Sequence, residues 1–364
     1  MVASPLYFRQ LAVEHGAHAY SQDFLAEDMR SRLRSVPDGR AMAQMTGFVY
    51  DHSAIEQRFI EVDIDEIDRR HDWIRMVNQA NQSLATRALL RLFNSGADPR
   101  ECGALVVVSS SYSGFPSLSR RLLEPCGFSL DTVCYDLAGL GCAGPTHAIA
   151  FAHALLQQGF TGAVCVVCVD AMATHGQARH HKHAPSMAQI VAHALASDGA
   201  AALVIGRDPG PSPLFSFESC RLTSHQWPSS LDQNDLTADE DNEPFLSVGK
   251  DIRTRILPEL SKVLDDDALS SSVFLHPGGA ALMRSLKSRY PTLVPSADLS
   301  MSVLAEHGNL GASSLLWVLD RALRRGASID PRFRLVALGP GIVTTSLLVD
   351  GARRLDRAEA HSPS

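Results

Sequence analysis

Three side chains on glycine-marked turns could together carry out covalent chemistry on sulfur. Cys142 follows Gly141 where an apolar approach meets a helical pattern. His276 ends an apolar stretch and precedes Pro-Gly-Gly, and Asn309 follows Gly308. A thiol can hold an acyl group as a thioester, while an imidazole and an amide can stabilise the enolate and the thioester oxyanion. The set therefore indicates acyl chemistry on sulfur and suits a decarboxylative condensation.

The position of Cys142 favours its ionised form. A helix is expected over residues 144–158, and the dipole and N–H groups of its first turn should lower the thiol pKa, with help from a nearby imidazole. Each residue also has a structural alternative: a buried cysteine, a hydrogen-bonded core histidine and a helix-capping asparagine. The combination of the three types is what favours function.

Length and composition exclude several classes of protein. The chain has 364 residues, of which 45% are hydrophobic and 20% are charged, with a net charge of -7. This is an ordinary globular balance, and nothing in it points to nucleic acid. The first 20 residues lack a signal-peptide profile, and no stretch approaches the roughly 18 apolar residues of a membrane-spanning helix. We therefore expect a soluble cytoplasmic protein.

Alternating strand and helix patterns predict an α/β fold with parallel strands. The expected helices cover residues 66–93, 144–158, 247–264, 279–289 and 312–324, and the expected strands 104–109, 132–135, 163–169, 200–205, 272–275, 335–338 and 343–349. Cys165 and Cys168 fall within a continuous apolar run, so a buried strand is expected there rather than a redox or zinc pair.

The same pattern occurs in both parts of the chain. We expect one α/β half over residues 1–208, carrying the cysteine, and a similar half over residues 209–351, carrying the histidine and the asparagine. Loops from both halves would then meet at one cleft. The polar residues 352–364 are expected to form a disordered tail.

Five motifs occur in a characteristic order: Gly-Cys-Ala-Gly at 141–144, Ala-Leu-Ala-Ser-Asp-Gly-Ala-Ala-Ala at 194–202, His-Pro-Gly-Gly at 276–279, Gly-Asn at 308–309 and Gly-Pro-Gly at 339–341. In these motifs the chain resembles type III polyketide synthases, the chalcone-synthase-like branch of the thiolase superfamily. The resemblance covers most of the chain after about residue 100. It implies a five-layered αβαβα thiolase-like fold built from two similar halves, normally a homodimer.

By this resemblance Cys142 would accept the acyl starter. His276 would help to ionise the thiol and, with Asn309, would bind the malonyl thioester carbonyl during decarboxylation. The implied activity is that of an acyltransferase of the EC 2.3.1 type. It would use acyl-CoA or acyl-carrier-protein thioesters and malonyl-CoA or another malonyl thioester as substrates, with no cofactor and no metal.

The resemblance also implies a substrate pocket. Ala196 stands where the family carries a gatekeeper Phe, so the pocket should be wider. Phe245 matches a second gatekeeper, and Phe115 lies where family members place a side chain across the dimer interface. The pocket residues expected in this way are Ala196, Ser197, Phe245, Phe115, Gly278, Gly279 and Gly341.

Two segments depart from the family pattern. Residues 45–52, where plant members carry basic residues for CoA phosphates, contain no Lys or Arg, which leaves room for a carrier-protein donor. Residues 175–183 contain four histidines. A solvated polar loop is expected there rather than a metal site, because no Cys or carboxylate completes a ligand set.

We therefore predict a type III polyketide synthase-like enzyme of secondary-metabolite biosynthesis. A bulky or long-chain starter would give an alkylpyrone, an alkylresorcinol or a β-keto acyl product. One alternative is a single-step ketoacyl synthase or acyltransferase that uses carrier-protein-bound substrates. Another is a non-catalytic thiolase-fold partner subunit. A cysteine hydrolase is disfavoured, because His-Pro-Gly-Gly is not expected in that class.

Overall fold

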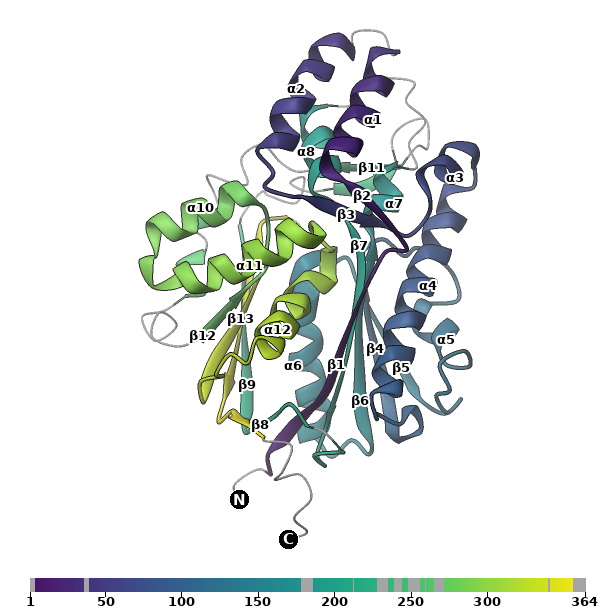
Figure 1. Cartoon of the computed structure of the whole chain (residues 1–364). Helices are drawn as coiled ribbons and strands as arrows, with labels where there is room; N and C mark the ends of the chain where they lie inside the picture. Colours follow the sequence, from purple (N-terminus) through teal and green to yellow (C-terminus); the bar gives the residue numbers. More distant parts are fainter. Residues whose placement is uncertain are drawn as a thin grey trace.

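The computed structural model describes residues 4–35, 39–177, 186–211, 213–227, 235–238, 244–247, 256–258, 260–264, 272–339 and 341–355. Within these residues, two large β-sheets lie side by side, with helices between them and on both outer faces (Figure 1). The described chain begins and ends at the end of the molecule opposite α1 (Gln22–Arg34) and α2 (Gly39–Asp51).

The first sheet has the order β15-β8-β1-β7-β6-β4-β5. Its strands are β1 (Leu6–His15), β4 (Cys102–Ser109), β5 (Val133–Ala138), β6 (Ala163–Ala171), β7 (Asp198–Gly206), β8 (Phe215–Phe217) and β15 (Arg353–Arg354). Strands β5, β4 and β6 are parallel, as expected, but β7 is antiparallel to β6. The expected all-parallel arrangement is wrong there, because the chain leaves β6 and enters β7 at the same end of the sheet.

The second sheet has the order β12-β13-β14-β9. Its strands are β9 (Ser219–Gln226), β12 (Ser272–Leu275), β13 (Arg332–Gly339) and β14 (Val343–Asp350). Only β12 and β13 are parallel. Two small sheets complete the set, β2 (His18–Ser21) with β3 (Gln57–Ile60), and β10 (Asp235–Ala238) with β11 (Pro244–Ser247).

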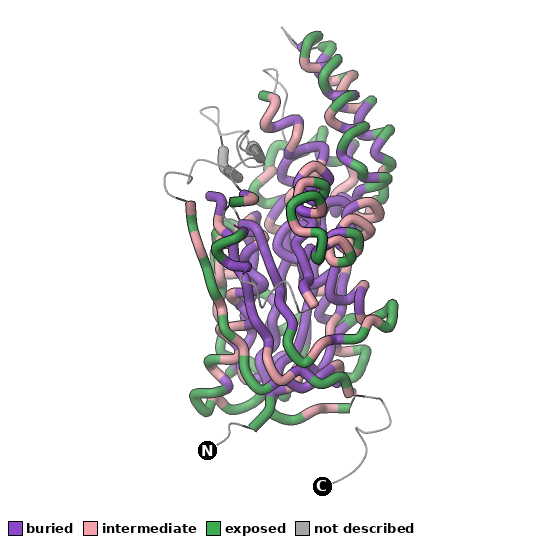
Figure 2. The backbone as a smooth tube through the Cα atoms, turned by 90° about the vertical axis from the view of Figure 1, so that its left-hand side faces the viewer, coloured by how far each residue is buried: buried purple, intermediate pink, exposed green. Residues whose placement is uncertain are grey.

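Helices form the other three layers. α6 (Gly144–Gln157) and α12 (Ser314–Arg324) lie between the sheets, and one cluster of buried side chains joins both helices to both sheets. α4 (Trp73–Asn94) and α5 (Leu118–Leu122) cover the outer face of the first sheet. α10 (Ala280–Arg289) and α11 (Val294–His307) cover that of the second. This confirms the predicted five-layered fold, and Figure 2 shows buried residues running through its centre.

A helical cap covers one end of these layers. It contains α1 (Gln22–Arg34), α2 (Gly39–Asp51), α3 (Ile64–Arg69), α7 (Met172–Gln177) and α8 (Met187–Leu195). Its own cluster of buried side chains includes Tyr50, Ile190 and Ala196. Strands β6 and β7 both reach this end, so the cap lies over the edge where loops from the two sheets meet.

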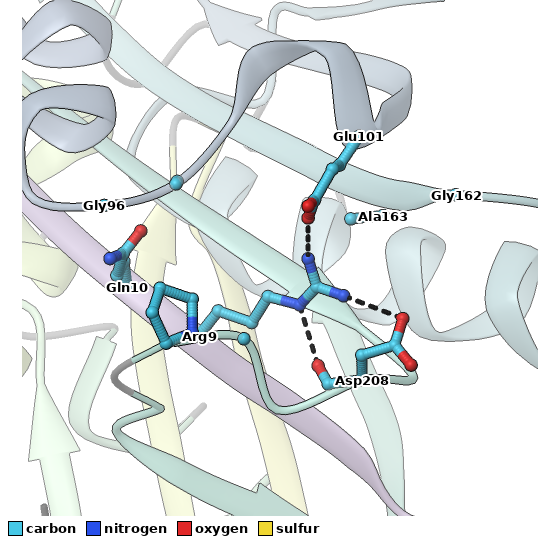
Figure 3. Close-up of a pocket in the computed structure, with 10 residues that line it drawn as sticks. Arg9, Gln10, Gly96, Glu101, Gly162, Ala163 and Asp208 are labelled. Atoms are coloured by element: carbon cyan, nitrogen blue, oxygen red, sulfur yellow. Dashed lines mark hydrogen bonds and ion pairs between the residues drawn. The ribbon is translucent and has the colours of Figure 1, made fainter. Parts of the chain in front are cut away.

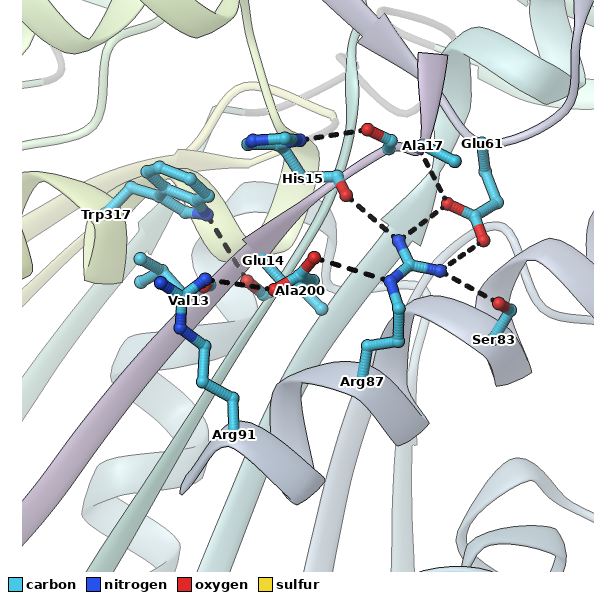
Figure 4. Close-up of polar contacts among 11 residues, drawn as sticks. Val13, Glu14, His15, Ala17, Glu61, Ser83, Arg87, Arg91, Ala200 and Trp317 are labelled. Carbon is cyan, nitrogen blue, oxygen red and sulfur yellow. Dashed lines mark hydrogen bonds and ion pairs between the residues drawn. The ribbon is translucent and has the colours of Figure 1, made fainter. Parts of the chain in front are cut away.

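An ion-pair network fixes the cap strand β3 to the layered body (Figure 4). The Arg87 guanidinium of α4 binds both carboxylate oxygens of Glu61, at 2.6 and 2.8 Å, and Glu14 at 3.3 Å. It also donates to the carbonyl of His15. Because Glu61 follows β3 and Glu14 belongs to β1, one bidentate arginine joins three elements.

Most of the other expected elements are confirmed, with small shifts at their ends. The helix expected over 66–93 is two helices, since Arg70 is extended between α3 and α4. Half of the helix expected over 247–264 lies outside the described residues, and Ser247 at its expected start ends β11 instead. The division at residue 208 stays a prediction: β8, which follows it, joins the first sheet, and β9 joins the second. Arg353 of the predicted tail pairs in β15, and residues 356–364 lie outside the described part.

Candidate active site

Cys142 lies in a short 3-10 turn, Gly141–Ala143, that leads directly into α6. Gly141 has a positive φ of 48°, which favours glycine. Its N–H donates to the Ser110 hydroxyl at 2.7 Å, which ties the cysteine turn to the loop after β4. Pro145 sits in the first turn of α6, where its missing N–H costs nothing.

The environment of Cys142 differs from the expected one. Burial raises the pKa of the thiol, and the negative charge of Asp170 raises it further. The expectation of an ionised thiol at rest is therefore wrong for this state, because lost solvation outweighs the helix N-terminus. The raised pKa favours the neutral thiol at neutral pH, so acylation of Cys142 requires a base to take its proton.

His276 directly follows β12. Its N–H donates to the Val336 carbonyl of β13 at 2.9 Å, and its own carbonyl accepts from the N–H of Gly278 at 2.9 Å. The side chain is buried, and burial lowers the imidazole pKa to about 3. Its Nδ1 has no hydrogen-bond partner among the described residues. The ring is therefore neutral, with one nitrogen that can donate a hydrogen bond and one that can accept a proton.

Asn309 is fixed through both its backbone and its side chain. Its N–H donates to the Leu195 carbonyl, and its carbonyl accepts from the N–H of Ser197, both at 2.8 Å. Its Oδ1 accepts from the N–H of Gly311 at 3.1 Å and from the Ser314 hydroxyl at 3.2 Å. Asn309 thus caps the helical turn that follows it. The same bonds orient its amide, so that the acceptor faces the turn and the Nδ2 donors face away from it.

Asp170 joins the cysteine turn to the asparagine turn. Its carboxylate accepts from the N–H groups of Ser110 and Ser111 on one side and from that of Ala312 on the other. The sequence analysis did not single it out. The available signal was an acidic residue at the end of the apolar run 163–171, with no basic residue in the run.

The histidine turn reaches the same place through β13. Gly339 ends β13, and a Cβ built on it would lie 2.8 Å from Cβ of Ala143. Since β12 and β13 are parallel, His276 at the end of β12 lies at the same edge. A Cβ built on Gly279 would lie 3.8 Å from a methyl group of Leu195, beside the bridge to Asn309. The three predicted catalytic residues therefore belong to turns that converge under the cap.

The predicted pocket residues fall into different environments. Ala196 is buried, and its carbonyl accepts from Arg58 at 2.9 Å. The Ser197 hydroxyl is also buried and bonds to the N–H and the carbonyl of Phe59, at 2.7 and 3.1 Å. It serves to hold β3, and its place in a pocket stays a prediction.

Three further pocket predictions concern the turns. Gly278 and Gly279 belong to the histidine turn, and Gly341 has a positive φ of 68° in the turn between β13 and β14. Phe245 of β11 pairs through its backbone with Thr237 of β10, and its side chain lies outside the described residues. Strand β11 contacts α8, which ends next to Ala196.

Phe115 lies apart from these residues. It is 95% exposed, so it is an unusually bare aromatic side chain in a single copy of the chain. This exposure is compatible with the expected dimer contact, which stays a prediction. Of the histidine-rich segment, residues 178–183 lie outside the described part, while His175 is buried and packs edge-on against Trp73.

Arg58 is a fully buried cation beside the site. Its guanidinium donates to Gln22 at 2.9 Å and to the carbonyls of His193 and Ala196. Burial lowers its pKa. Arg58 thus connects α1 of the cap to the end of α8 and holds the backbone at the predicted gatekeeper position.

Two comparisons with known proteins bear on the family and the fold. Residues 61–212 match a family model described as "FAE1/Type III polyketide synthase-like protein". Over these residues the chain is similar to type III polyketide synthases. Its fold is similar to the crystal structure of the C-terminal type III polyketide synthase domain of "Steely1", a type I/III hybrid from Dictyostelium, with a TM-score of 0.79 and 19% identity. That similarity covers 95% of this chain and 99% of the Dictyostelium domain.

The family match supports a polyketide-synthase-like condensing enzyme of the acyltransferase class, and it implies acyl thioester substrates. The structural similarity confirms the thiolase-like fold. Among the described residues, no helix combines the length and the apolar character needed to cross a membrane.

Proposed function

We propose that this type III polyketide synthase-like protein condenses an acyl starter with a malonyl thioester on Cys142. The observation that supports this most strongly is the convergence of the Cys142, His276 and Asn309 turns under the cap. A thiol, a neutral imidazole and an oriented amide are the groups that such a reaction needs.

In the first step the Cys142 sulfur attacks the carbonyl of the acyl thioester. The thiol proton passes to His276, which can accept it because its ring is neutral at rest. The thiol of the donor leaves and takes up that proton. The product is an acyl group bound to Cys142, with His276 neutral again.

In the second step a malonyl thioester loses carbon dioxide. The carbonyl oxygen becomes an enolate oxygen and accepts hydrogen bonds from the His276 ring N–H and from the Asn309 amide. The enolate carbon attacks the acyl-Cys142 carbonyl and expels the Cys142 sulfur as a thiolate, which takes up a proton from solvent. The β-keto acyl product remains on the donor thiol that carried the malonyl group.

The finer features of the proposal follow from particular positions. The small side chain at Ala196 favours a bulky or long-chain starter, and an alkylpyrone, alkylresorcinol or β-keto product. The absence of Lys and Arg in residues 45–52 favours a carrier-protein donor over free CoA thioesters. We also propose a cytoplasmic homodimer with Phe115 at its interface and a reaction without cofactor or metal.

Intact-protein mass spectrometry tests the proposal. The protein is incubated with a panel of acyl-CoA and acyl-carrier-protein donors, with Cys142→Ala as the matched control. We expect an acyl adduct on the unmodified chain and none on Cys142→Ala. A preference for acetyl over long acyl groups would contradict the starter assignment. Folded protein that forms no adduct with any donor would favour the non-catalytic partner subunit.

A further inference from the structure

Asp170 is a buried carboxylate whose contacts exceed what the end of a strand requires. It lies near the end of β6 and is fully buried, and burial raises its pKa. Every hydrogen-bond partner that the described part of the chain gives it is a neutral N–H or O–H group. A buried carboxylate without a cation is costly unless donors satisfy it, so its position depends on these donors.

One carboxylate oxygen faces the cysteine turn. Oδ1 accepts from the N–H of Ser110 at 2.7 Å, from the N–H of Ser111 at 3.1 Å and from the Ser111 hydroxyl at 3.2 Å. The Ser110 hydroxyl in turn accepts from the N–H of Gly141, the residue before Cys142. A single intermediate residue therefore connects Asp170 to the turn that carries the nucleophile.

The other carboxylate oxygen faces the asparagine turn. Oδ2 accepts from the N–H of Ala312 at 2.8 Å, and the neighbouring N–H of Gly311 donates to the Asn309 side chain. A Cβ built on Gly311 would lie 2.7 Å from both Cβ and Oδ2 of Asp170, so the turn approaches the carboxylate as closely as glycine allows. The gap between the two turns is thus bridged by one carboxylate.

Ser111, on the cysteine side of this bridge, is held in turn by contacts to α4 and to the end of β6. The Ser111 hydroxyl lies 3.0 Å from Oδ1 of Asn81 on α4 and accepts from the N–H of Ala171 at 2.9 Å. Asn81 is fully buried and donates to the Val77 carbonyl of its own helix. The Asp170 bridge is therefore anchored to the rigid outer layer of the first sheet.

We propose that Asp170 is a positioning residue that sets the separation between the Cys142 turn and the Asn309 turn. It would thereby hold the acyl thioester on Cys142 within reach of the enolate bound at Asn309. The inference rests on the proposed function for its catalytic meaning, while the bridge itself is a property of the fold. Small displacements between reacting groups are expensive, because a shift of about 1 Å can cost about 100-fold in rate.

The test is the Asp170→Asn variant, compared with Asp330→Asn. An amide keeps one acceptor oxygen but presents an NH2 group on its other side, so it cannot accept on both sides of the bridge. Asp330 is the matched control, because it accepts from the N–H and the hydroxyl of Ser272 at the far end of β12 from His276. The acylation rate of Cys142, the condensation rate and the melting temperature are measured for each protein.

We expect Asp170→Asn to remain folded and to lose about 100-fold in condensation rate. Asp330→Asn should condense like the unmodified chain. A second readout is the pH dependence of Cys142 alkylation by iodoacetamide. Because the Asp170 charge raises the pKa of the thiol, its loss should move the alkylation midpoint to lower pH. That shift reports the effect of the Asp170 charge on the thiol, while the loss in condensation rate relative to Asp330→Asn reports the positioning role.

Ser110→Ala provides a second variant in case Asp170→Asn fails to fold. It removes the acceptor for the N–H of Gly141 and leaves the Asp170 carboxylate in place. We expect it to slow acylation of Cys142 by about 10-fold without loss of fold. Unmodified rates in both variants would overturn the proposal, as would equal losses in Asp170→Asn and Asp330→Asn. If the unmodified chain forms no acyl adduct, the proposed function fails, while the alkylation midpoint still tests Asp170.

Discussion

The two ends of the first sheet hold carboxylates in opposite ways. Under the cap, Asp170 is fully buried and bound by neutral N–H and O–H groups. At the other end, Arg9 binds Glu101 at 2.9 Å and Asp208 at 3.2 Å, and all three residues line a pocket (Figure 3). The side chains of Glu101 and Asp208 are 61% and 86% exposed.

The difference separates precise positioning from general attachment. Exposed ion pairs tolerate movement and contribute little, because water and salt screen them. A buried carboxylate with fixed neutral donors tolerates little movement, because any donor that it leaves is stranded without water. The chain has the buried carboxylate at the end where the cysteine, histidine and asparagine turns must keep fixed positions relative to one another.

The largest expected effect comes from removing each carboxylate in turn. Asp170→Ala strands the N–H groups of Ser110, Ser111 and Ala312, so the free energy of unfolding should fall by about 3 kcal/mol. Asp208→Ala should change it by less than about 0.5 kcal/mol. Urea unfolding of both variants measures this. Equal losses would remove the distinction between the two ends.

A smaller change at the catalytic end is Gly339→Ala. The added methyl group would lie 2.8 Å from Cβ of Ala143, so the cysteine turn must shift. We expect Cys142 acylation to slow by about 100-fold in a folded protein. Gly326→Ala is the control, because its added Cβ meets nothing within 4 Å, although its positive φ costs some stability. Acylation at the unmodified rate in Gly339→Ala would show that the turns are not closely coupled.

The burial of His276 should make the free energy of unfolding depend on pH. Its folded pKa of about 3 lies below the unfolded value, so the unfolded state takes up a proton first as the pH falls. Stability is therefore complete above about pH 6.5 and falls below it, by at most about 1.4 kcal/mol per pH unit. In the His276→Asn variant, the free energy of unfolding measured in urea should fall less steeply between about pH 6.5 and pH 5. An unchanged slope in this variant would assign the decrease to other groups.

The smallest effect is expected at the exposed end. Arg9→Met removes both ion pairs and the hydrogen bond from Nε to the Asp208 carbonyl, but it keeps an apolar stem in the buried position of Arg9. Because both carboxylates are exposed, the free energy of unfolding should fall by about 1 kcal/mol or less. Raising the salt concentration should narrow the difference between Arg9→Met and the unmodified chain. A loss above about 3 kcal/mol would show that the contacts of Arg9 stabilise the fold as much as those of Asp170 at the catalytic end.

Sequence patterns predicted most of the strands and helices, and the family resemblance predicted the five layers, while the catalytic roles of Cys142, His276 and Asn309 stay predictions. The apolar run at 163–169 and the glycine-marked turn at Cys142 are local features of the sequence, and the structure forms a buried strand and a turn at these positions. The antiparallel entry into β7 was missed, because strand direction depends on where the connection runs and not on the strand's own residues. The raised pKa of Cys142 was missed for a similar reason: burial and the Asp170 charge come from segments distant in sequence.

The most direct test of the account follows acyl-Cys142 through one condensation. The protein is first loaded with its preferred acyl donor and then given malonyl thioester, and carbon dioxide release and the mass of the product are measured together. We predict that Asn309→Ala will form the acyl adduct but release little carbon dioxide and extend nothing. Extension at the unmodified rate by Asn309→Ala, or by Cys142→Ala, would contradict the claim that the three turns form one condensing site.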